Sequence, residues 1–494
     1  MNFSPFKPTL YLVSALFLAS CSSSGDGDSP LELAEVDVQT EIDQPPGATT
    51  DTTTETDLDS DQISDTDTEP GNPPVVIESA AFGEPGICTT AGINAWVDTQ
   101  MRDYYIYFDQ VPVVDPSDYD TPAALLADLR VQPDVYSSIL PQAERTALFD
   151  EGETFGFGFS LGRDQQSALR FSNIVSGSPM NQAGILRGDR LLAINGIPEL
   201  DITDNLFDQI FGELGDPTAV TFTIARGNEA LRDVTVTSAT YTINTVAEVR
   251  TYDINGTKVG YIESSRFLRT SEAEIDRAIE TMFEENPSDV ILDFRYNGGG
   301  FVFVAQKFAA QLVGRNFVGR TFQSTSFNRN YEQFNRTALL EEQDIHLDLS
   351  RVIILTTNGT ASASEAIANN LRPYIDVVLI GDRTRGKPFA SVANPNCDML
   401  LNAMDRITSN DVGETVLGGI PATCEVSDNF LYPQSSPEDA LLGGALHYIE
   451  TSTCPVATAF DQIAEFRASF IRAPIDTYTE SPMPNGVFDS IELP

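Results

Sequence analysis

Few side chains in this chain can act as a base near neutral pH. Its 494 residues include two histidines, His346 and His447, and four lysines. A serine hydroxyl needs a neighbouring base before it becomes a nucleophile. Because histidine is this rare, a lysine with a lowered pKa is the natural substitute for it.

Cationic side chains of any kind are scarce. The sequence has 29 Lys and Arg against 73 Asp and Glu, which gives a net charge of −44. Such a surface repels nucleic acid and anionic lipid head groups, and it suits either a salty medium or general solubility. The length allows two or three domains, and the hydrophobic content of 41% allows a sizeable core.

The N-terminus has no apolar run long enough to favour spanning a membrane. Leu10 to Ala19 is a short apolar run after Lys7, so residues 1–21 are predicted to be an export signal. Its last four residues, Leu-Ala-Ser-Cys21, resemble a bacterial lipobox, which implies lipidation of Cys21. Ser22 then favours the outer membrane; the alternative is an ordinary cleaved signal.

The other four cysteines are an even number in an exported chain, and they predict disulfides. Three pairings are possible. We favour Cys397–Cys424, which closes one loop, and Cys88–Cys454, which ties the ends of the folded region together. Neither a Cys-x-x-Cys motif nor clustered histidines occur, so we predict no metal site.

Residues 22–78 contain no lysine or arginine and few large apolar side chains. This composition cannot bury enough surface to offset chain entropy, and it predicts a disordered acidic tether. Residues 79–152 follow as a helical region, because Ile93, Trp96 and Met101 recur at helical spacing and Pro122–Leu129 has a helix start.

Glycines and phenylalanines alternate at Gly156, Phe157, Gly158 and Phe159, and the segment Ala183–Gly196 follows. Together they resemble a PDZ domain of the kind found in bacterial proteases, over residues 153–240. The resemblance implies that the Gly156–Phe159 strand offers backbone amides to a peptide's terminal carboxylate, and that the peptide adds as a further strand. Alone, the alternation would equally fit a strand with a bulge.

Buried strands alternate with helices from about Val246 onward. Three apolar runs begin at Val290, Val352 and Asp376. This alternation predicts an α/β layer over residues 241–460 with active residues at the strand ends. The tail, 461–494, carries no further signal.

Ser362 follows one buried strand and opens a helix, where the positive helix end helps a nucleophile. Ser362 and Glu365 also form a capping-box pattern, and the two roles are compatible. Lys387 follows the next strand, so both side chains should meet at one sheet edge. A lysine has a reference pKa of about 10.4 and must be buried to act as a base. We therefore expect Lys387 to be enclosed, and Lys258 and Lys307 to lie at the surface.

A glycine run after the strand at Val290 predicts an oxyanion hole, because glycine lets backbone approach a ligand closely. Two amides must point at one site. We expect one from Gly299 or Gly300 and the other from Ala363.

Four segments carry a family resemblance: Val259–Ile262, Leu292–Gly300, Thr360–Glu365 and Gly381–Lys387. They resemble the C-terminal processing (tail-specific) serine peptidase family, in an exported lipoprotein branch, over roughly residues 90–450. The resemblance implies an α/β core of the ClpP/crotonase type and no cofactor. It makes Ser362, not Ser364, the nucleophile, Lys387 the general base and Glu365 their support. A glutamine that supports the lysine in many members is Ser391 here.

These observations predict a serine endopeptidase that cleaves exported or envelope polypeptides, captured by their unfolded C-terminal tails. The predicted location is the outer membrane or periplasm of a bacterium. The protein would contact the membrane only through its lipid anchor, and it would bind no nucleic acid. The alternative is a non-catalytic PDZ scaffold on a peptidase-like fold, favoured by Ser391. A β-lactam-type hydrolase fits less well, because its Ser-x-x-Lys motif occurs only at Ser4–Lys7.

Overall fold

The computed structural model describes residues 86–455 except 165, 203, 212–214 and 228, all within one compact unit. The predicted signal with Cys21, the tether at 22–78 and the tail at 461–494 lie outside these residues. Within the described ranges, no helix is both long and apolar enough to cross a membrane.

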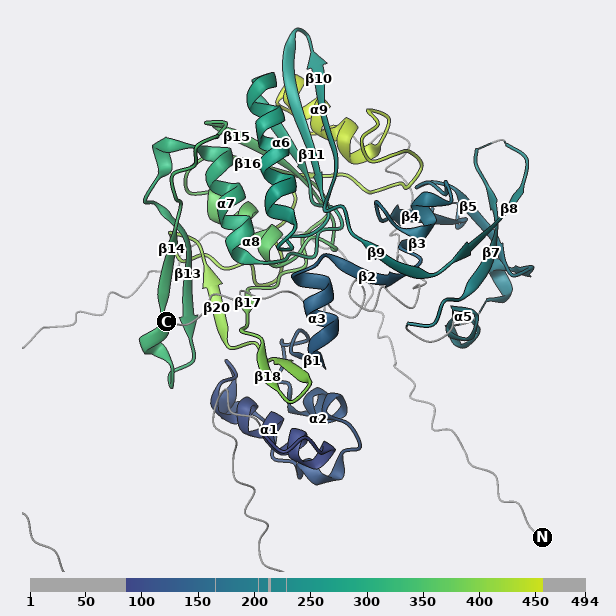
Figure 1. Ribbon diagram of the computed structural model, residues 1–494. Helices are drawn as coiled ribbons and strands as arrows, with labels where there is room; N and C mark the ends of the chain where they lie inside the picture. Colours follow the sequence, from purple (N-terminus) through teal and green to yellow (C-terminus); the bar gives the residue numbers. More distant parts are fainter. Residues whose placement is uncertain (1–85, 165, 203, 212–214, 228, 456–494) are drawn as a thin grey trace, which may run out of the picture. The chain divides into compact units, whose positions relative to one another are not determined.

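A six-stranded sheet forms the centre of the α/β layer (Figure 1). Its order is β10 (Val246–Ile254), β11 (Thr257–Ser264), β12 (Asp289–Asp293), β15 (Arg351–Thr356), β16 (Asp376–Gly381) and β21 (Cys424–Glu425). β10 is antiparallel to β11, and the others run parallel. The carboxyl ends of the parallel strands therefore meet at one edge, where active residues are expected.

Helices cover both faces of this sheet, which explains the nearly continuous apolar runs of its strands. α6 (Ser271–Glu285), α7 (Val302–Val313) and α8 (Ala363–Leu371) pack on one face, and α9 (Ala440–Thr451) packs on the other. Along β12, Val290 and Leu292 face the first group while Ile291 faces α9. The predicted mixed α/β architecture is confirmed.

A second, antiparallel sheet was not predicted. It has the order β14 (Arg336–Leu339), β13 (Thr321–Phe327), β20 (Arg406–Ser409) and β17 (Phe389–Ala390). Its strands mix polar with apolar residues, and all but β13 have at most four residues, so they lack a clear period-2 signal. A third sheet joins β1 (Ser138–Pro141) to β19 (Met399–Asn402) and β18 (Asn394–Asn396).

The chain before residue 153 forms α1 (Thr90–Asp103), α2 (Pro122–Leu129) and α3 (Gln142–Phe149). Thr89 and Thr121 accept hydrogen bonds from the free amides at the starts of α1 and α2. Trp96, Met101 and Leu125 share one continuous core with α6, α7 and α8. This helical region therefore packs against the α/β layer and shares its core.

Residues 153–242, called here the 153–242 module, have a separate core of phenylalanine rings. β2 (Glu153–Gly156) pairs with β9 (Ala239–Thr242). The larger sheet has the order β3 (Phe159–Arg163), β4 (Leu169–Ile174), β5 (Arg190–Ile194), β7 (Ala219–Ala225) and β8 (Arg232–Thr237), with β6 (Ile197–Pro198) beside β5. α4 (Pro179–Gln182) and α5 (Asp204–Phe211) complete it.

The prediction that Gly156–Phe159 is one strand is wrong. β2 ends at Gly156, which has a φ of +139°, and β3 begins at Phe159 in another sheet, so the segment is a turn. Gly158, with a φ of +78°, allows the turn; a Cβ there would lie 2.2 Å from the Ser178 Cβ. The alternation of Gly and Phe thus reflects backbone freedom and core packing rather than the two faces of a strand.

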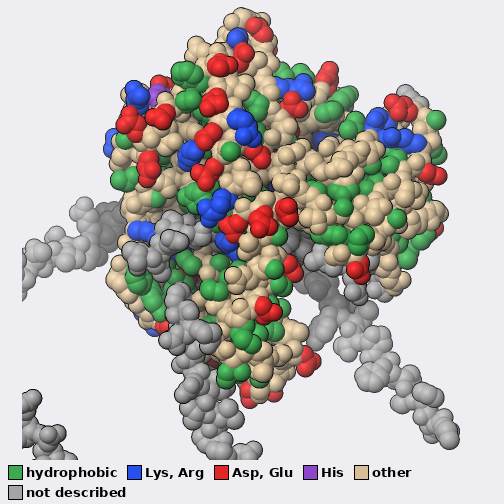
Figure 2. All heavy atoms as spheres, viewed as in Figure 1, with side chains coloured by type: hydrophobic (Ala, Val, Ile, Leu, Met, Phe, Trp, Pro, Cys, Tyr) green, Lys and Arg blue, Asp and Glu red, His purple; other side chains and the backbone are tan. Residues whose placement is uncertain are grey.

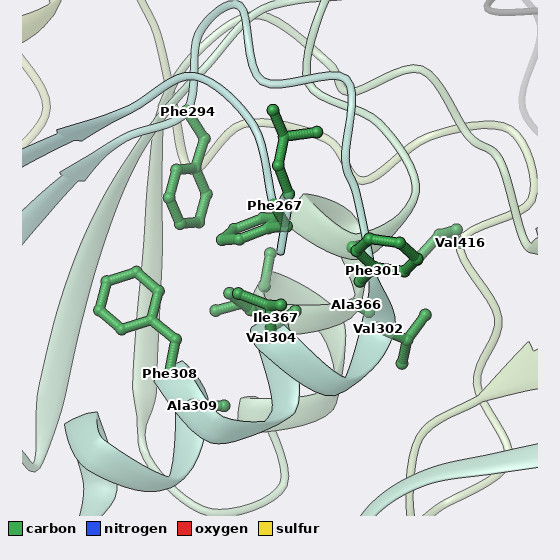
Figure 3. Packing of buried hydrophobic residues seen from close by; sticks show 14 of the residues in the cluster. Phe267, Phe294, Phe301, Val302, Val304, Phe308, Ala309, Ala366, Ile367 and Val416 are labelled. Atoms are coloured by element: carbon green, nitrogen blue, oxygen red, sulfur yellow. The ribbon is translucent and has the colours of Figure 1, made fainter. Parts of the chain in front are cut away.

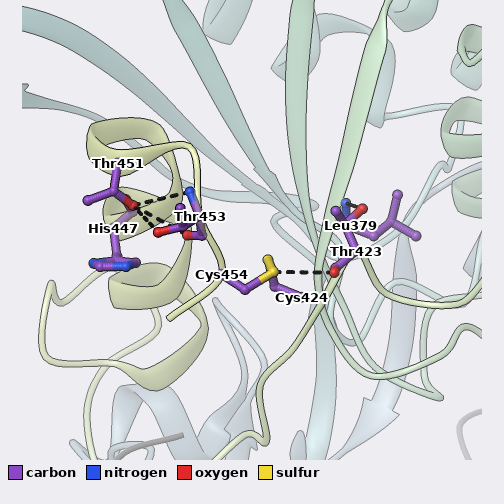
Figure 4. The surroundings of a disulfide bond; sticks show 7 residues. All are labelled: Leu379, Thr423, Cys424, His447, Thr451, Thr453 and Cys454. Carbon is purple, nitrogen blue, oxygen red and sulfur yellow. Dashed lines mark hydrogen bonds between the residues drawn. A yellow bond between two sulfur atoms is a disulfide. The ribbon is translucent and has the colours of Figure 1, made fainter. Parts of the chain in front are cut away.

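All four described cysteines form disulfides, but our favoured pairing is wrong. The bonds are Cys88–Cys397 and Cys424–Cys454 (Figure 4), with Cα–Cα distances of 5.6 and 5.3 Å. Cys397 lies between β18 and β19, whereas Cys424 is in β21 of the central sheet. Cys397 and Cys424 are therefore near each other in the sequence but are not bonded to each other in the fold.

Candidate active site

Ser362 lies where the turn after β15 enters α8. Its φ of +57° and ψ of −117° are sparsely populated by residues other than glycine, a kind of strain that often marks functional sites. Two hydrogen bonds hold this turn against the neighbouring loop: Ala361 N and Ser364 Oγ both donate to Asn297 O, at 3.1 and 3.0 Å. Ser364 is therefore a structural residue, while Ser362 keeps 9% of its surface exposed.

Lys387 lies after β16 and is enclosed, with 2% of its surface exposed. Burial lowers the pKa of its ammonium well below the usual range, against the opposing effect of Asp134 and Glu365. Lys258 and Lys307 are instead ion-paired with Glu285 and Asp276, and their side chains are 52% and 31% exposed. Lys387 alone of these three lysines has the surroundings that a neutral base needs.

Ser362 and Lys387 both line one hollow of about 340 Å³, counting the part that opens to solvent. The structure thus brings together the two side chains that the sequence predicted to meet. Neither His346 nor His447 lines it; His447 is on α9, across the central sheet (Figure 4). The residues around the hollow are Val302, Gln323, Ser362, Ala363, Ala366, Asn369, Asn370, Lys387, Phe389, Ala390, Thr408 and Val416.

Glu365, fully buried, ties the segments of Ser362 and Lys387 together. Its Oε2 accepts hydrogen bonds from Ser362 N and Lys387 N, both at 2.9 Å. Its Oε1 accepts from Thr384 Oγ at 2.5 Å and Gly386 N at 2.7 Å. Burial raises the pKa of the Glu365 carboxyl, and these four donors oppose the rise. Glu365 is a positioning residue for both partners.

The loop after β12 packs directly against Ser362. Arg295 is fully buried and pairs with Asp293 and Asp439, which fixes the start of this loop. Gly299 has a φ of +106°, and a Cβ there would lie 2.8 Å from the Ser362 Cβ. Any side chain at this position would therefore displace Ser362.

The predicted oxyanion-hole residues lie together, but their amides differ. Gly299 N donates to Asn297 Oδ1 at 2.9 Å and is already engaged. In the described part of the chain, the amides of Ala363 and Gly300 donate to no other protein group. Of the two glycines expected from the sequence, Gly300 is thus the one with an amide to offer.

Tyr136 is a site residue that sequence reasoning missed. Its ring centroid lies 5.2 Å from Lys387 Nζ and 6.1 Å from the Phe389 ring. Asp134 holds it there by accepting from Tyr136 N at 2.7 Å and Ser137 N at 2.9 Å. The Asp-x-Tyr-Ser pattern indicates a local turn, but nothing local indicates contact with a lysine so far along the chain.

Ser391, at the position of the supporting glutamine, is fully buried, and its Oγ has no hydrogen-bond partner among the described residues. The Tyr136 ring, by contrast, packs beside Lys387 Nζ. Across the same described residues, His, Cys, Asp and Glu form no group suited to a metal ion.

The predicted peptide-binding residues Gly156, Phe157, Gly158 and Phe159 lie in the 153–242 module. Phe157 and Phe159 are fully buried in its core. Phe157 O accepts from Met180 N at 3.1 Å and Gly158 O accepts from Val175 N at 3.0 Å, so the turn is fixed. β3, which begins at Phe159, is the end strand of its sheet.

Two family models match parts of this chain that contain site residues. Residues 258–414 match the model of peptidase family S41, and residues 92–138 match the peptidase S41 N-terminal domain. Ser362 and Lys387 lie in the first match and Tyr136 in the second.

Two curated relatives match about half of this chain. A carboxyl-terminal-processing protease of Picosynechococcus is 26% identical over 51% of this chain and 60% of its own length. A "Probable CtpA-like serine protease" of Staphylococcus aureus is 28% identical over 55% of this chain and 52% of its own length. The chain therefore spans little more than half the length of these relatives.

A solved structure shares the fold. A Bacteroides fragilis protein titled "Putative S41 protease" superposes with a TM-score of 0.61 at 22% identity, covering 72% of this chain and 97% of that one. This likeness supports the mixed α/β peptidase fold.

Proposed function

We propose that this chain, whose residues 258–414 match the model of peptidase family S41, is a serine endopeptidase of the C-terminal processing type. One observation carries the proposal: a buried lysine with a lowered pKa lines the same hollow as a strained, partly exposed serine. A serine and a neutral lysine are sufficient for acyl transfer by nucleophilic catalysis.

Neutral Lys387 accepts the Ser362 proton as Ser362 Oγ attacks the carbonyl carbon of the peptide bond. The amides of Ala363 and Gly300 stabilise the oxyanion that forms. The Lys387 ammonium then gives its proton to the leaving amine, and an acyl-enzyme remains on Ser362. Water, deprotonated by Lys387, releases the acyl group. Glu365 holds both partners in place through the four bonds it accepts.

Substrate capture is assigned to the 153–242 module, proposed to act as a PDZ domain. β3 is an end strand, and the turn before it presents backbone at the point where a peptide's carboxylate would bind. An unfolded C-terminal tail could add beside β3 and lead the chain towards the site. Amidation of a model substrate's C-terminus would slow cleavage if this capture operates, and would leave it unchanged otherwise.

The cellular location is proposed from the N-terminal sequence. A short apolar run that ends in Leu-Ala-Ser-Cys21 supports export and lipid attachment in a bacterial envelope. Labelling cells with a radioactive fatty acid would mark the parent protein and spare the Cys21→Ala variant. Label in both proteins would contradict attachment at this cysteine.

Covalent labelling tests the nucleophile directly. A fluorophosphonate or sulfonyl fluoride should add slowly to Ser362, and peptide mass mapping should find the adduct there. Labelling should disappear in Lys387→Met and persist in Lys258→Met, because Lys258 is an exposed ion-paired lysine. An adduct on another serine, or equal labelling of all three proteins, would contradict the proposal and favour a non-catalytic scaffold.

A further inference from the structure

The hollow beside Ser362 is lined by both apolar and polar side chains. Val302, Ala366 and Val416 form part of the wall and continue into the apolar core (Figure 3). The polar residues are the amides Gln323, Asn369 and Asn370 with Thr408. Asn370 is eight residues after Ser362 on α8, about 12 Å along the helix at 1.5 Å per residue. Asn370 therefore lies away from the reacting atoms, whereas Thr408 bonds to Pro388 O, next to Lys387.

Two of these four polar side chains, Gln323 and Asn370, keep hydrogen-bonding capacity that the protein does not use. The other two are engaged: Thr408 Oγ donates to Pro388 O at 3.1 Å, and Asn369 Nδ2 donates to Glu414 O at 2.9 Å. Gln323, 4% exposed, makes no side-chain hydrogen bond with any described residue. Asn370 Oδ1 accepts one long bond from Asn369, at 3.4 Å, while its Nδ2 donates to none of the described groups.

Neither Gln323 nor Asn370 is among the described polar groups that are sealed from solvent without a partner, so water can pair with both side chains while the hollow is empty. Gln323 and Asn370 come from different elements, β13 and α8, yet line the same hollow. A guest with a hydrogen-bonding end would satisfy both. An apolar guest of equal size would exclude water from them and leave them unpaired.

The charges that line the hollow further restrict the kind of side chain that it can bind. Among the described residues that line it, only Lys387 is ionisable. A cationic guest would be repelled whenever Lys387 is protonated and would find no carboxylate in this described lining. An anionic guest would favour the ammonium form of Lys387 and remove the base that the reaction needs. An uncharged guest avoids both effects.

We propose that this hollow is the S1 subsite and that Gln323 and Asn370 make it select an uncharged side chain with a hydrogen-bonding end, such as glutamine, asparagine or threonine. The inference rests on the proposed peptidase function. Ser362, Lys387 and Ala363 all line the hollow, so it lies beside the proposed nucleophile and base, and we assign it to the side chain nearest the attacked carbonyl. A site built to hydrogen-bond its substrate discriminates strongly against the analogue that lacks the polar group.

The test compares side chains of equal shape. Internally quenched peptides that differ only before the cleaved bond, Asn against Leu, Gln against Met and Thr against Val, are incubated with the full chain, and the cleaved bond is mapped by mass spectrometry. We expect kcat/KM to favour the polar member by about 10- to 100-fold. Gln323→Met and Asn370→Leu should each reduce that ratio towards unity.

Gln306→Met is the matched control, because Gln306 is on α7, bonds to Leu339 O and is not among the residues that line the hollow. It should keep the parent's ratio. Cleavage of both members at equal rates by the parent would overturn the subsite assignment and leave the peptidase function intact. A ratio unchanged in both folded variants would overturn the roles of Gln323 and Asn370. Cleavage of no peptide would overturn the proposed function and this inference with it.

Discussion

Replacing Glu365 by glutamine tests whether this carboxylate holds the nucleophile and the base together. Glutamine keeps one oxygen and places an NH₂ group where the other oxygen was. The best orientation keeps the oxygen on Ser362 N and Lys387 N, which can only donate. The NH₂ then faces Thr384, whose hydroxyl can rotate and accept, and Gly386 N, which cannot.

The substitution therefore loses one to two hydrogen bonds to a buried carboxylate, each worth about 1.5–3 kcal/mol. The Glu365→Gln variant also avoids the cost of burying a charge, so we expect the free energy of unfolding to fall by about 1–3 kcal/mol. Glu365→Ala leaves all four donors unpaired and should cost more. Activity should fall in both variants, because the amides of Ser362 and Lys387 lose part or all of their shared partner.

Urea denaturation at pH 7, followed by circular dichroism, measures the first effect, and peptide cleavage by the folded variants measures the second. Glu414→Gln is the control: Glu414 is exposed and accepts one side-chain bond, from Asn410 at 3.3 Å. It should change stability by less than about 0.5 kcal/mol. A Glu365→Gln protein as stable and active as the parent would refute the reasoning.

Three further predictions concern the same site. Lys387→Met should abolish cleavage yet raise the free energy of unfolding near neutral pH, by about 1.4 kcal/mol per unit of pKa lowering. This gain in the free energy of unfolding should shrink as pH rises towards the ordinary lysine pKa, because Lys387 of the unfolded parent then also loses its proton. A Lys387→Met variant that is less stable than the parent would contradict the prediction. Tyr136→Ala should move the acid limb of the pH–rate profile to higher pH by admitting water to Lys387, whereas Tyr136→Phe should leave it in place. Gly299→Ala should remain folded but lose activity, since its Cβ would meet Ser362; full activity would place the nucleophile elsewhere.

The sequence predicted those parts of the site that depend on local pattern. Ser362 and Lys387 each follow a buried apolar strand, and parallel strands place their ends at one edge, so the meeting of the two was predictable. Lysine burial was predictable for a different reason: the proposed chemistry requires it.

Contacts between distant, weakly patterned segments were not predictable. Tyr136 reaches Lys387 because Asp134 turns the chain there, and Gln323 reaches the hollow on a strand of mixed polarity. The predicted disulfide pairing was wrong for the same reason. The positions of β18 and β21 in the fold decide which cysteines meet, and the spacing of the cysteines along the sequence does not.

The net charge, like cysteine spacing, did not predict the position of a site. Acidic and basic side chains are spread over the visible face in Figure 2 rather than gathered into one patch. The net charge of −44 therefore indicated what the chain repels but not where a ligand binds. The site had to be found from nucleophile, base and backbone geometry.

The central claim is that Ser362 and Lys387 form the catalytic pair. The most direct measurement is cleavage of an unfolded protein substrate by the parent, Ser362→Ala, Lys387→Met and Lys258→Met, with folding of each variant verified. The account predicts cleavage by the parent and by Lys258→Met, and none by the other two. Cleavage that survives in folded Ser362→Ala or Lys387→Met would contradict it.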